Sequence, residues 1–358
     1  MPLPRASGVA CRLLIGVSLL SLMLLASACA NVPQSSVLPK TEAAREIHWL
    51  YELIFWLAVI VFVGVQGALL YIMWRYRYRE GHALPDQVHG NTALEIGWTI
   101  APAVVLVIMA VPTIRTIFAL ETPATTSPGG GAPLIVDVIG KQWWWEYRYP
   151  EFQDAQGRPL TTANEMVLPV GRTAVLRMTS DNVIHSWWVP QLMGKMDVMP
   201  THITEIWFTP EEPGQYFGQC AEYCGIQHAM MRTNVIAMTP TDFQAWVTRQ
   251  MLPAQPIAEV TPDTAALIAA GAEAFQLNGC IGCHTIQAAI PEEGKIGPNL
   301  SHFGSRTTLA AGVMQNTHEN LAHWLENPQA IKPGNFMPNL LLRPQDIEAL
   351  VAYLHSLK

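Results

Sequence analysis

The chain has 358 residues, of which 50% are hydrophobic and only 14% are charged, whereas an ordinary soluble domain carries about 25% charged residues. Its formal net charge of -7 provides no basic field for phosphates, so the composition argues against nucleic-acid binding. Six cysteines are too few for a disulfide scaffold, and four of them fall in two close pairs that indicate binding sites. We therefore expect several domains and at least one membrane-spanning segment.

The N-terminal residues are typical of an export signal. Arg5 and Arg12 supply positive charge, residues 13–25 are apolar, and the small residues 26–28 form a cleavage site. We predict a signal peptide over residues 1–28. Cys29 follows directly, and the pattern leaves open whether this cysteine is lipidated or simply follows the cleavage site.

Two apolar runs, at about 47–74 and 96–118, are each long enough to span a bilayer and predict a transmembrane hairpin over residues 41–120. Between them lie Arg75, Arg77 and Arg79, which the positive-inside rule places in the cytoplasm. We therefore predict a two-pass protein of the bacterial inner (plasma) membrane. Everything after about residue 120 is expected on the periplasmic or extracellular side.

Two outer domains follow the hairpin. Residues 123–133 are rich in Ser, Thr, Gly and Pro and predict a flexible tether. Short β-rich runs within residues 132–252 then predict a small antiparallel barrel or sandwich. These runs are 134–139, 142–149, 165–170, 173–179 and 204–209.

A second linker is predicted at residues 253–262, and the pattern then changes to a helical period. Apolar residues recur at spacings of three and four over 265–277, 319–326 and 344–357. Residues 263–358 therefore predict a small all-α domain.

The α-domain carries the pattern Cys280-Ile-Gly-Cys283-His284. In this pattern two thiols attach a haem c covalently and the histidine becomes an axial ligand. The segment Phe336-Met337-Pro338 resembles the methionine loop of small, class I c-type cytochromes, which favours Met337 as the sixth ligand. Other side chains could take that position by residue type, namely Met314, His302, His318 and His323.

The β-domain carries a second cluster of metal-binding residue types. Within twelve residues, from Cys220 to Met231, the chain has two cysteines, one histidine and two methionines, and His185 precedes them. Soft sulfur ligands combined with imidazole suit copper. A mononuclear blue-copper site or a Cys2His2 zinc site could also use part of the set, but each would leave a potential ligand without a role.

This cluster resembles the binuclear CuA centre of cytochrome c oxidase subunit II, and the appended haem domain is similar to that of the caa3-type oxidases. The resemblance implies a two-helix transmembrane hairpin, a cupredoxin-like antiparallel β-barrel and an all-α class I cytochrome c domain. By the same resemblance, each ligand has a role: Cys220 and Cys224 bridge the coppers, His185 and His228 are terminal, Met231 is a weak ligand, and Glu222 contributes its backbone carbonyl. The Glu222 side chain is expected to reach a magnesium ion at the interface with subunit I.

Two further residues acquire roles from the resemblance. Trp143, in the run Gln142 to Tyr147, matches the point at which electrons enter subunit II, although tryptophans in a strand also fill cores. Glu95 matches the acid at the cytoplasmic mouth of a proton pathway. It also completes a capping-box pattern with Thr92 that would simply start a helix.

We therefore expect an electron-transfer subunit of a respiratory haem-copper oxidase with no catalytic residues of its own. Electrons would pass through haem c and CuA to the haems of subunit I, where oxygen is reduced to water and protons are pumped. Expected partners are subunit I with its haem and CuB, subunit III, and a cytochrome c or an upstream reductase as donor. The alternatives are a nitric oxide reductase subunit and a free-standing, membrane-anchored copper-binding protein.

Overall fold

The computed structural model describes residues 16–17, 20–21, 32–81, 89–121, 125–254, 261–286 and 296–358. The predicted signal peptide, apart from four of its residues, and Cys29 lie outside the described residues. The middle of the predicted linker, residues 255–260, also lies outside them.

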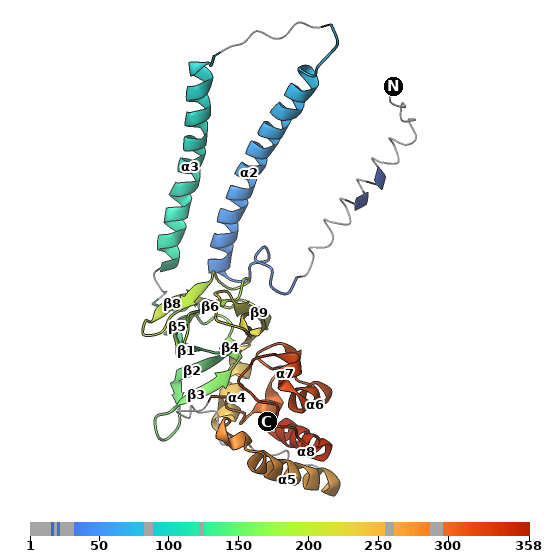
Figure 1. The fold of residues 1–358 in the computed structure, drawn as a ribbon. Coiled ribbons are helices and arrows are strands. Elements are labelled where there is room, and N and C mark those ends of the chain that lie inside the picture. The colour runs from blue at the N-terminus through green and yellow to red at the C-terminus, as the bar shows by residue number, and fades with distance from the viewer. Residues whose placement is uncertain are drawn as a thin grey trace.

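Two long helices, α2 (Glu42–Arg75) and α3 (Thr92–Glu121), stand next to each other above the rest of the molecule (Figure 1). Thr41 caps α2, because its side chain accepts a hydrogen bond from Ala44 N at 3.1 Å, and its hydroxyl also donates to Leu192 O in the β-domain at 2.5 Å. At the end of α3, Leu120 O accepts a hydrogen bond from Trp207 Nε1 at 3.0 Å. The start of α2 and the end of α3 are therefore both hydrogen-bonded to the β-domain.

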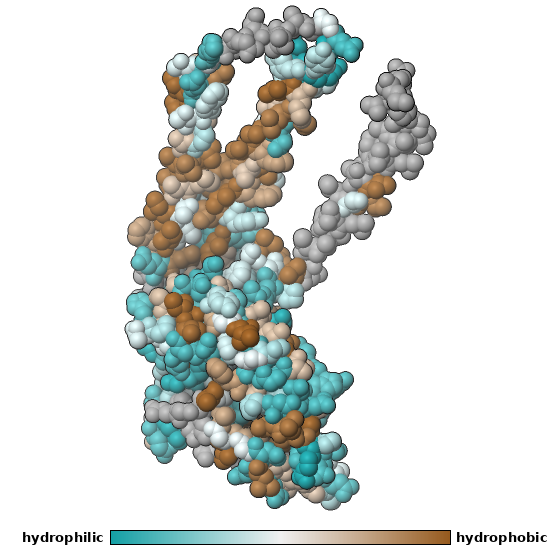
Figure 2. Space-filling model, in the orientation of Figure 1, coloured by the Kyte–Doolittle hydropathy of each residue, from teal (hydrophilic) through white to brown (hydrophobic). Residues whose placement is uncertain are grey.

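Both helices are apolar and exposed along almost their whole length, as the brown surface of the hairpin in Figure 2 indicates. Among the described residues, these two helices are long and apolar enough to cross a membrane. Pro102 and Pro112 lie inside α3 without ending it. Because exposed apolar area of this extent is unfavourable in water, the hairpin fits a lipid or protein environment.

The β-domain is a sandwich of two five-stranded sheets. One sheet has the order β3-β2-β1-β5-β8, and the other has the order β4-β10-β9-β6-β7. The strands are β1 (Leu134–Lys141), β2 (Trp144–Gln153), β3 (Pro159–Ala163), β4 (Glu165–Pro169), β5 (Ala174–Ser180), β6 (His185–Trp188), β7 (Met196–Val198), β8 (Thr204–Phe208), β9 (Gly214–Cys220) and β10 (Arg232–Met238).

The sandwich differs from the prediction in the direction of its strands, because its sheets are mixed rather than wholly antiparallel. Strand β1 runs parallel to β5, and β4 runs parallel to β10. Parallel neighbours require long connections between them, and here the chain crosses between the two sheets to make them. A prediction from local turn signals finds hairpins and misses such pairs.

The core of the sandwich is aromatic. Trp145, Trp187, Tyr147, Tyr149 and Phe208 are among its largest fully buried side chains. Their polar atoms have partners: Tyr149 donates to Val167 O at 3.1 Å, and Trp187 Nε1 donates to Tyr147 Oη at 3.2 Å. Helix α4 (Pro240–Met251) closes one end of the core.

The C-terminal domain is helical, as predicted. It contains α5 (Pro262–Leu277), α6 (His318–Glu326), α7 (Pro328–Ile331) and α8 (Pro344–Ser356), with the short β11 (Thr308–Leu309) and β12 (Met314–Gln315). Three single-turn 3-10 helices complete the described elements, namely η1 (His228–Met230) in the β-domain and η2 (Cys280–Gly282) and η3 (Phe303–Ser305) here. Thr261 caps α5 with Pro262 at the first helical position, a favourable pairing. Helices α5 and α8 pack closely at Gly271.

We predict that Gly271→Ala loosens the pair of helices α5 and α8. A Cβ at this position would lie 2.1 Å from Ala349 O and 2.6 Å from Tyr353 Cβ, so the helices would have to separate. Overpacking of this kind costs about 1–3 kcal/mol, which corresponds to about 5- to 150-fold faster hydrogen exchange of the α5 and α8 amides. Mass spectrometry of the full chain in detergent measures this exchange.

Ala270→Leu is the matched control, since Ala270 lies on the same helix but is exposed. This control should exchange at the rate of the unmodified chain. Equal exchange in Gly271→Ala would contradict the close packing of the two helices.

Candidate metal centre and haem cavity

The sulfur cluster forms where β9 ends and β10 begins. Cys220 is the last residue of β9, the intervening loop carries Cys224, His228 and Met231, and β10 starts at Arg232. Strand β6 lies beside β9, with Trp187 opposite Cys220, which brings His185 from a distant part of the sequence to the same place. The sheet register therefore assembles ligands that are 35 or more residues apart.

The distances within the cluster are uniform. Cys220 Sγ lies 3.8 Å from Cys224 Sγ and 3.9 Å from His185 Nδ1. Cys224 Sγ lies 3.8 Å from His228 Nδ1 and 3.9 Å from Met231 Sδ. Cys220, Cys224, Met231 and His185 are buried. Each cysteine thus has the other cysteine and one histidine as neighbours, and Met231 is next to Cys224.

These spacings fit a metal centre. Two donors that bind one metal at about 2.0–2.3 Å in a tetrahedral arrangement lie roughly 3.3–3.8 Å apart, and the neighbouring donors here are 3.8–3.9 Å apart, close to that range. Two thiols, two imidazoles and a thioether form a soft donor set that suits copper. The set of His185, Cys220 and Cys224 has its ligand atoms within 4.8 Å of one another.

The electrostatics of the two thiols also favour a bound cation. The contact between the two thiols lowers the pKa of Cys220, and the contact with His185 lowers it further, although burial acts in the opposite direction. The same contact between the thiols raises the pKa of Cys224, and burial adds to the effect. Because two adjacent thiolates repel each other, a metal cation is needed to hold both sulfurs deprotonated.

The backbone carbonyl of Glu222 faces the cluster, whereas its side chain faces the surface. Its carbonyl oxygen lies 3.2 Å from Cys220 Sγ, at the edge of the cluster. Its side chain is exposed, and Glu222 Oε1 accepts a hydrogen bond from Tyr223 N at 3.2 Å. The carbonyl is therefore close enough to be a ligand, whereas the carboxylate is directed to the surface.

The backbone of Gly140 packs closely against the imidazole of His185. This residue is 0% exposed, its Nε2 lies 3.3 Å from Asn182 Oδ1, and its ring packs edge-on against Trp145 at 5.7 Å. A Cβ on Gly140 would lie 2.7 Å from His185 Cδ2, so only glycine leaves room for the ring.

Trp143 lies directly beside the cluster. Its Nε1 donates to Cys224 O at 2.9 Å, and Gln142 Nε2 donates to the same oxygen at the same distance. The ring is 8% exposed because Phe336 of the helical domain covers it, with ring centroids 4.9 Å apart. Trp145, by contrast, fills the core, so neighbouring tryptophans of this segment have different environments.

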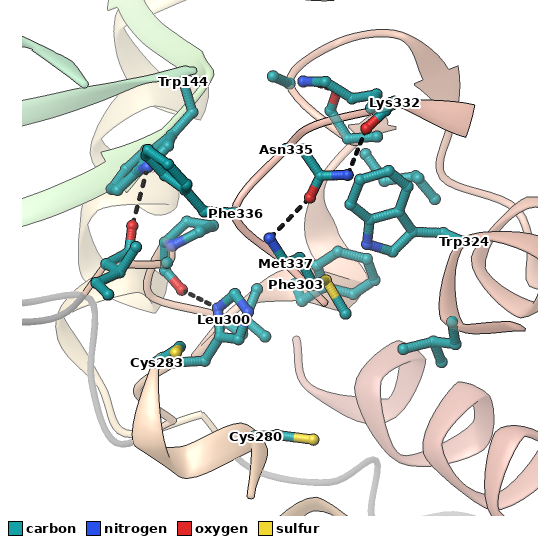
Figure 3. A pocket seen from close by; sticks show the side chains of 18 of the residues that line it. Trp144, Cys280, Cys283, Leu300, Phe303, Trp324, Lys332, Asn335, Phe336 and Met337 are labelled. Atoms are coloured by element: carbon teal, nitrogen blue, oxygen red, sulfur yellow. Dashed lines mark hydrogen bonds between the residues drawn. The ribbon is translucent and has the colours of Figure 1, made fainter. Parts of the chain in front are cut away.

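The helical domain contains a largely apolar cavity, which Figure 3 shows from close by. Cys280, Cys283 and His284 line one wall, and Met337 lies across the cavity from the two cysteines. His284 Nδ1 lies 2.8 Å from Pro298 O, which fixes the ring, and Gly297 packs so tightly on it that a Cβ would approach its Cε1 to 2.5 Å. A histidine held through one ring nitrogen presents the other to a metal, so this wall fits haem c.

A network of hydrogen bonds builds the loop that carries Met337. Gln329 Nε2 donates to Met337 O at 2.7 Å and to Asn335 O at 2.9 Å, and Asn335 Oδ1 accepts from Met337 N at 2.8 Å. No sequence pattern singles out Gln329. Among the described residues that line the cavity, Met337 is the candidate axial thioether. The alternative ligands Met314, His302, His318 and His323 do not belong to this lining.

Three charged residues that the sequence did not single out lie between the two domains, where Glu165 and Lys332 are buried and Arg306 is half-buried. Glu165 Oε1 accepts four hydrogen bonds, from the backbone N and the hydroxyl of both Thr307 and Thr308, at 2.6–2.9 Å. Burial lowers the pKa of Arg306 to about 10, and the Glu165 charge acts against this shift. Burial likewise lowers the pKa of Lys332 to about 8. Their partners in the opposite domain are more than 100 residues away in sequence, so no local pattern could reveal these contacts.

Glu95 lies in the first turn of α3 and is exposed. The predicted capping box is displaced by one residue, because Asn91 rather than Thr92 caps the helix: Asn91 Oδ1 accepts from Leu94 N at 3.2 Å. Helix initiation is thus accounted for without the Glu95 side chain.

Three protein families match successive parts of the chain. "Cytochrome C oxidase subunit II, transmembrane domain" matches residues 32–116, and "Cytochrome C oxidase subunit II, periplasmic domain" matches residues 134–238. "Cytochrome c" matches residues 268–358. The matches follow the same order as the hairpin, the sandwich and the helical domain.

Relatives match over most of the chain. Cytochrome c oxidase subunit 2 of Alkalihalophilus pseudofirmus is 36% identical over 318 residues, which cover 87% of this chain and 88% of the relative. The protein of the same name from Bacillus subtilis is 33% identical and covers 97% and 98%. Among solved structures, the periplasmic domain of subunit II of cytochrome oxidase from Bradyrhizobium japonicum is 30% identical, with a TM-score of 0.31, and covers 33% of this chain and 93% of that chain.

We predict that Gly140→Ala weakens metal binding at the cysteine cluster about 10- to 100-fold, the usual effect of disturbing a residue that orients a ligand. The added methyl group would displace the His185 ring from Cys220. Gly129→Ala, in the segment just before the β-domain, is the control, because the nearest atom to a Cβ there, Gly171 O, lies at an ordinary 3.7 Å. Copper titration followed by absorption spectroscopy measures both variants, and equal affinities would contradict the role of Gly140.

Proposed function

Because the chain belongs to the family of cytochrome c oxidase subunit 2 and carries a C-terminal cytochrome c domain, we propose that it relays electrons from haem c through a binuclear copper centre to subunit I. Membership makes it a membrane-anchored subunit of a haem-copper oxidase, with copper implied in the sandwich and haem c in the helical domain. The observation that carries the proposal is the contact of Trp143 with both Cys224 O and the ring of Phe336.

A centre with two coppers uses the whole donor set. Cys220 and Cys224 would bridge the metals, His185 and His228 would each bind one, and Met231 and the Glu222 carbonyl would complete them. The paired distances support this arrangement, since each sulfur has its own histidine at 3.8–3.9 Å. A single blue copper would leave one buried cysteine without a role.

In the helical domain, Cys280 and Cys283 would hold haem c by thioether bonds, with His284 and Met337 as axial ligands. Methionine ligation raises the reduction potential relative to bis-histidine ligation. This suits a carrier that delivers electrons to an oxidase. The apolar lining of the cavity supports the same assignment, because a buried haem is itself apolar.

The proposed path runs from the Met337 side of the haem through Phe336 and Trp143 to the copper loop. When bound, haem c and the copper pair would supply the one-electron chemistry of this path. The residues of the chain hold the distance and exclude water. Phe336 and Trp143 pack at 4.9 Å, and the Trp143 indole is fixed by its bond to Cys224 O.

The proposed partners are subunit I with its haem and CuB, subunit III, and a cytochrome c or an upstream reductase as electron donor. In subunit I, oxygen would be reduced to water with proton pumping. The proposed location is the bacterial inner membrane, with the two outer domains on the periplasmic side. The arginines at 75, 77 and 79 support this orientation, because they follow the end of α2 opposite the β-domain (Figure 1).

Two of the roles implied by the family concern the interface with subunit I. The exposed carboxylate of Glu222 would bind magnesium there, and its direction toward the surface supports the role. Glu95 would stand at the mouth of a proton pathway. Because Asn91 caps α3, the carboxylate of Glu95 is not required to start the helix, which favours the functional role.

We predict that Cys220→Ser abolishes the dicopper signal and leaves haem c in place. A serine hydroxyl remains protonated at neutral pH and cannot bridge two coppers, whereas Cys280 and Cys283 lie in the other domain. Electron paramagnetic resonance reports the copper, and the absorption spectrum reports the haem. Loss of both cofactors would point to a folding defect and would contradict two independent sites.

We predict that Trp143→Phe slows electron transfer from haem c to copper while both centres keep their spectra. The variant loses the hydrogen bond to Cys224 O and part of the contact with Phe336. Trp144→Phe is the matched control, since the Trp144 indole donates instead to Ile296 O at 3.2 Å. Transient absorption after flash reduction measures the rate, and equal rates in the two variants would contradict the path through Trp143.

A further inference from the structure

Lys332 belongs to the haem domain but reaches the copper loop. Its side chain lines the haem cavity, at the end where Asn335 and Trp324 also lie (Figure 3). Its Nζ donates to Met230 O at 3.0 Å, and Met230 directly precedes the proposed copper ligand Met231. It also donates to Ala310 O at 3.3 Å. One ammonium group therefore touches the surroundings of both proposed redox centres.

The charge of Lys332 is buried without a carboxylate partner. The residue is 4% exposed, and within the described part of the chain its ammonium group is bonded to backbone carbonyls and forms no ion pair. Arg306, the other cation that lines the cavity, has the nearby charge of Glu165 to balance it. Burial of a cation among backbone carbonyls is unfavourable for folding alone. The nearby group whose negative charge favours the Lys332 ammonium is the sulfur of Cys224, in the proposed copper cluster, which suggests that Lys332 has a role in function.

Several contacts around Lys332 hold the two domains in one relative position. Glu165 of the sandwich inserts its carboxylate among the donors of Thr307 and Thr308. Ala310 and Ala311 both adopt positive φ, 54° and 60°, and Ala311 O accepts a hydrogen bond from Arg232 N at 3.1 Å. Residues other than glycine keep such a backbone only where the surroundings hold it, so the two domains are docked at this point.

We propose that Lys332 is a positioning residue for electron transfer, which locks the haem domain onto the copper loop and places one shared positive charge between the two redox centres. The proposal rests on the proposed function, because it assumes haem c in the cavity and copper in the cluster. It adds a residue that acts on both centres without being a ligand of either.

The physical consequence concerns the two reduction potentials. When a centre gains an electron it becomes more negative by one charge, and a nearby cation stabilises that state. Removal of the Lys332 charge therefore lowers the potentials of haem c and of the copper pair together. Because both potentials fall together, the driving force for electron transfer from iron to copper changes little. Loss of the hydrogen bond from Lys332 to the copper loop instead disturbs the distance between the two centres, which slows the transfer.

Lys332→Met, Lys332→Arg and Lys358→Met, each in the complete oxidase complex, test the proposal. Potentials come from spectroelectrochemical titration of both centres, and the transfer rate comes from flash reduction. We expect Lys332→Met to lower both potentials and to slow the transfer. We expect Lys332→Arg, which keeps the charge, to restore both potentials. Lys358 is exposed in the same domain, and its replacement should shift neither potential.

Unchanged potentials in Lys332→Met, or a shift at one centre alone, would overturn the proposal. If Lys332→Met fails to assemble, Lys332→Gln decides the question, because glutamine keeps a donor for the two carbonyls but removes the charge. Lower potentials at both centres would then support the proposal, and unchanged potentials would overturn it. A wild-type complex that lacks haem c or a dicopper signal would instead refute the proposed function itself.

Discussion

The proposed electron relay depends on one contact, in which the indole of Trp143 donates to Cys224 O and packs against Phe336. The bond ties a residue of the sandwich to the loop that holds the sulfur cluster. The ring contact reaches the residue next to Met337 in the other domain. Two proposed cofactor sites in different domains are thereby held at a fixed separation. Electron transfer depends on such a separation more than on any reactive side chain, so in the proposed relay the main task of the protein is to maintain this geometry.

The other features of the interface serve the same geometry. Glu165 projects from the sandwich into the haem domain, and Lys332 projects from the haem domain toward the copper loop, so each domain contributes one buried charge to the other. Their hydrogen bonds satisfy groups that would be costly to bury alone. The membrane hairpin is attached at the opposite end of the sandwich (Figure 1). There Thr41 at the start of α2 and Leu120 at the end of α3 are hydrogen-bonded to the β-domain.

The parts of this architecture that could be predicted from the sequence depend on residues that are close together in the chain. The pattern from Cys280 to His284 and the cluster from Cys220 to Met231 place most candidate ligands within a few residues of one another. Long apolar runs likewise predict the hairpin. What could not be predicted depends on distant partners. The parallel pairing of β1 with β5 and the bonds of Glu165 and Lys332 join residues far apart in the chain. The ligand-bearing strands β6 and β9 were also missed, because they are short or interrupted by glycine.

The most direct test of the account is metal analysis combined with electron paramagnetic resonance of the purified chain, matured with haem and copper. The account predicts two coppers for each haem iron and a hyperfine pattern from one unpaired electron shared by both coppers. One copper or one zinc for each iron would contradict the binuclear centre. The cysteine cluster would then hold a single metal, and the proposed relay would lack its acceptor.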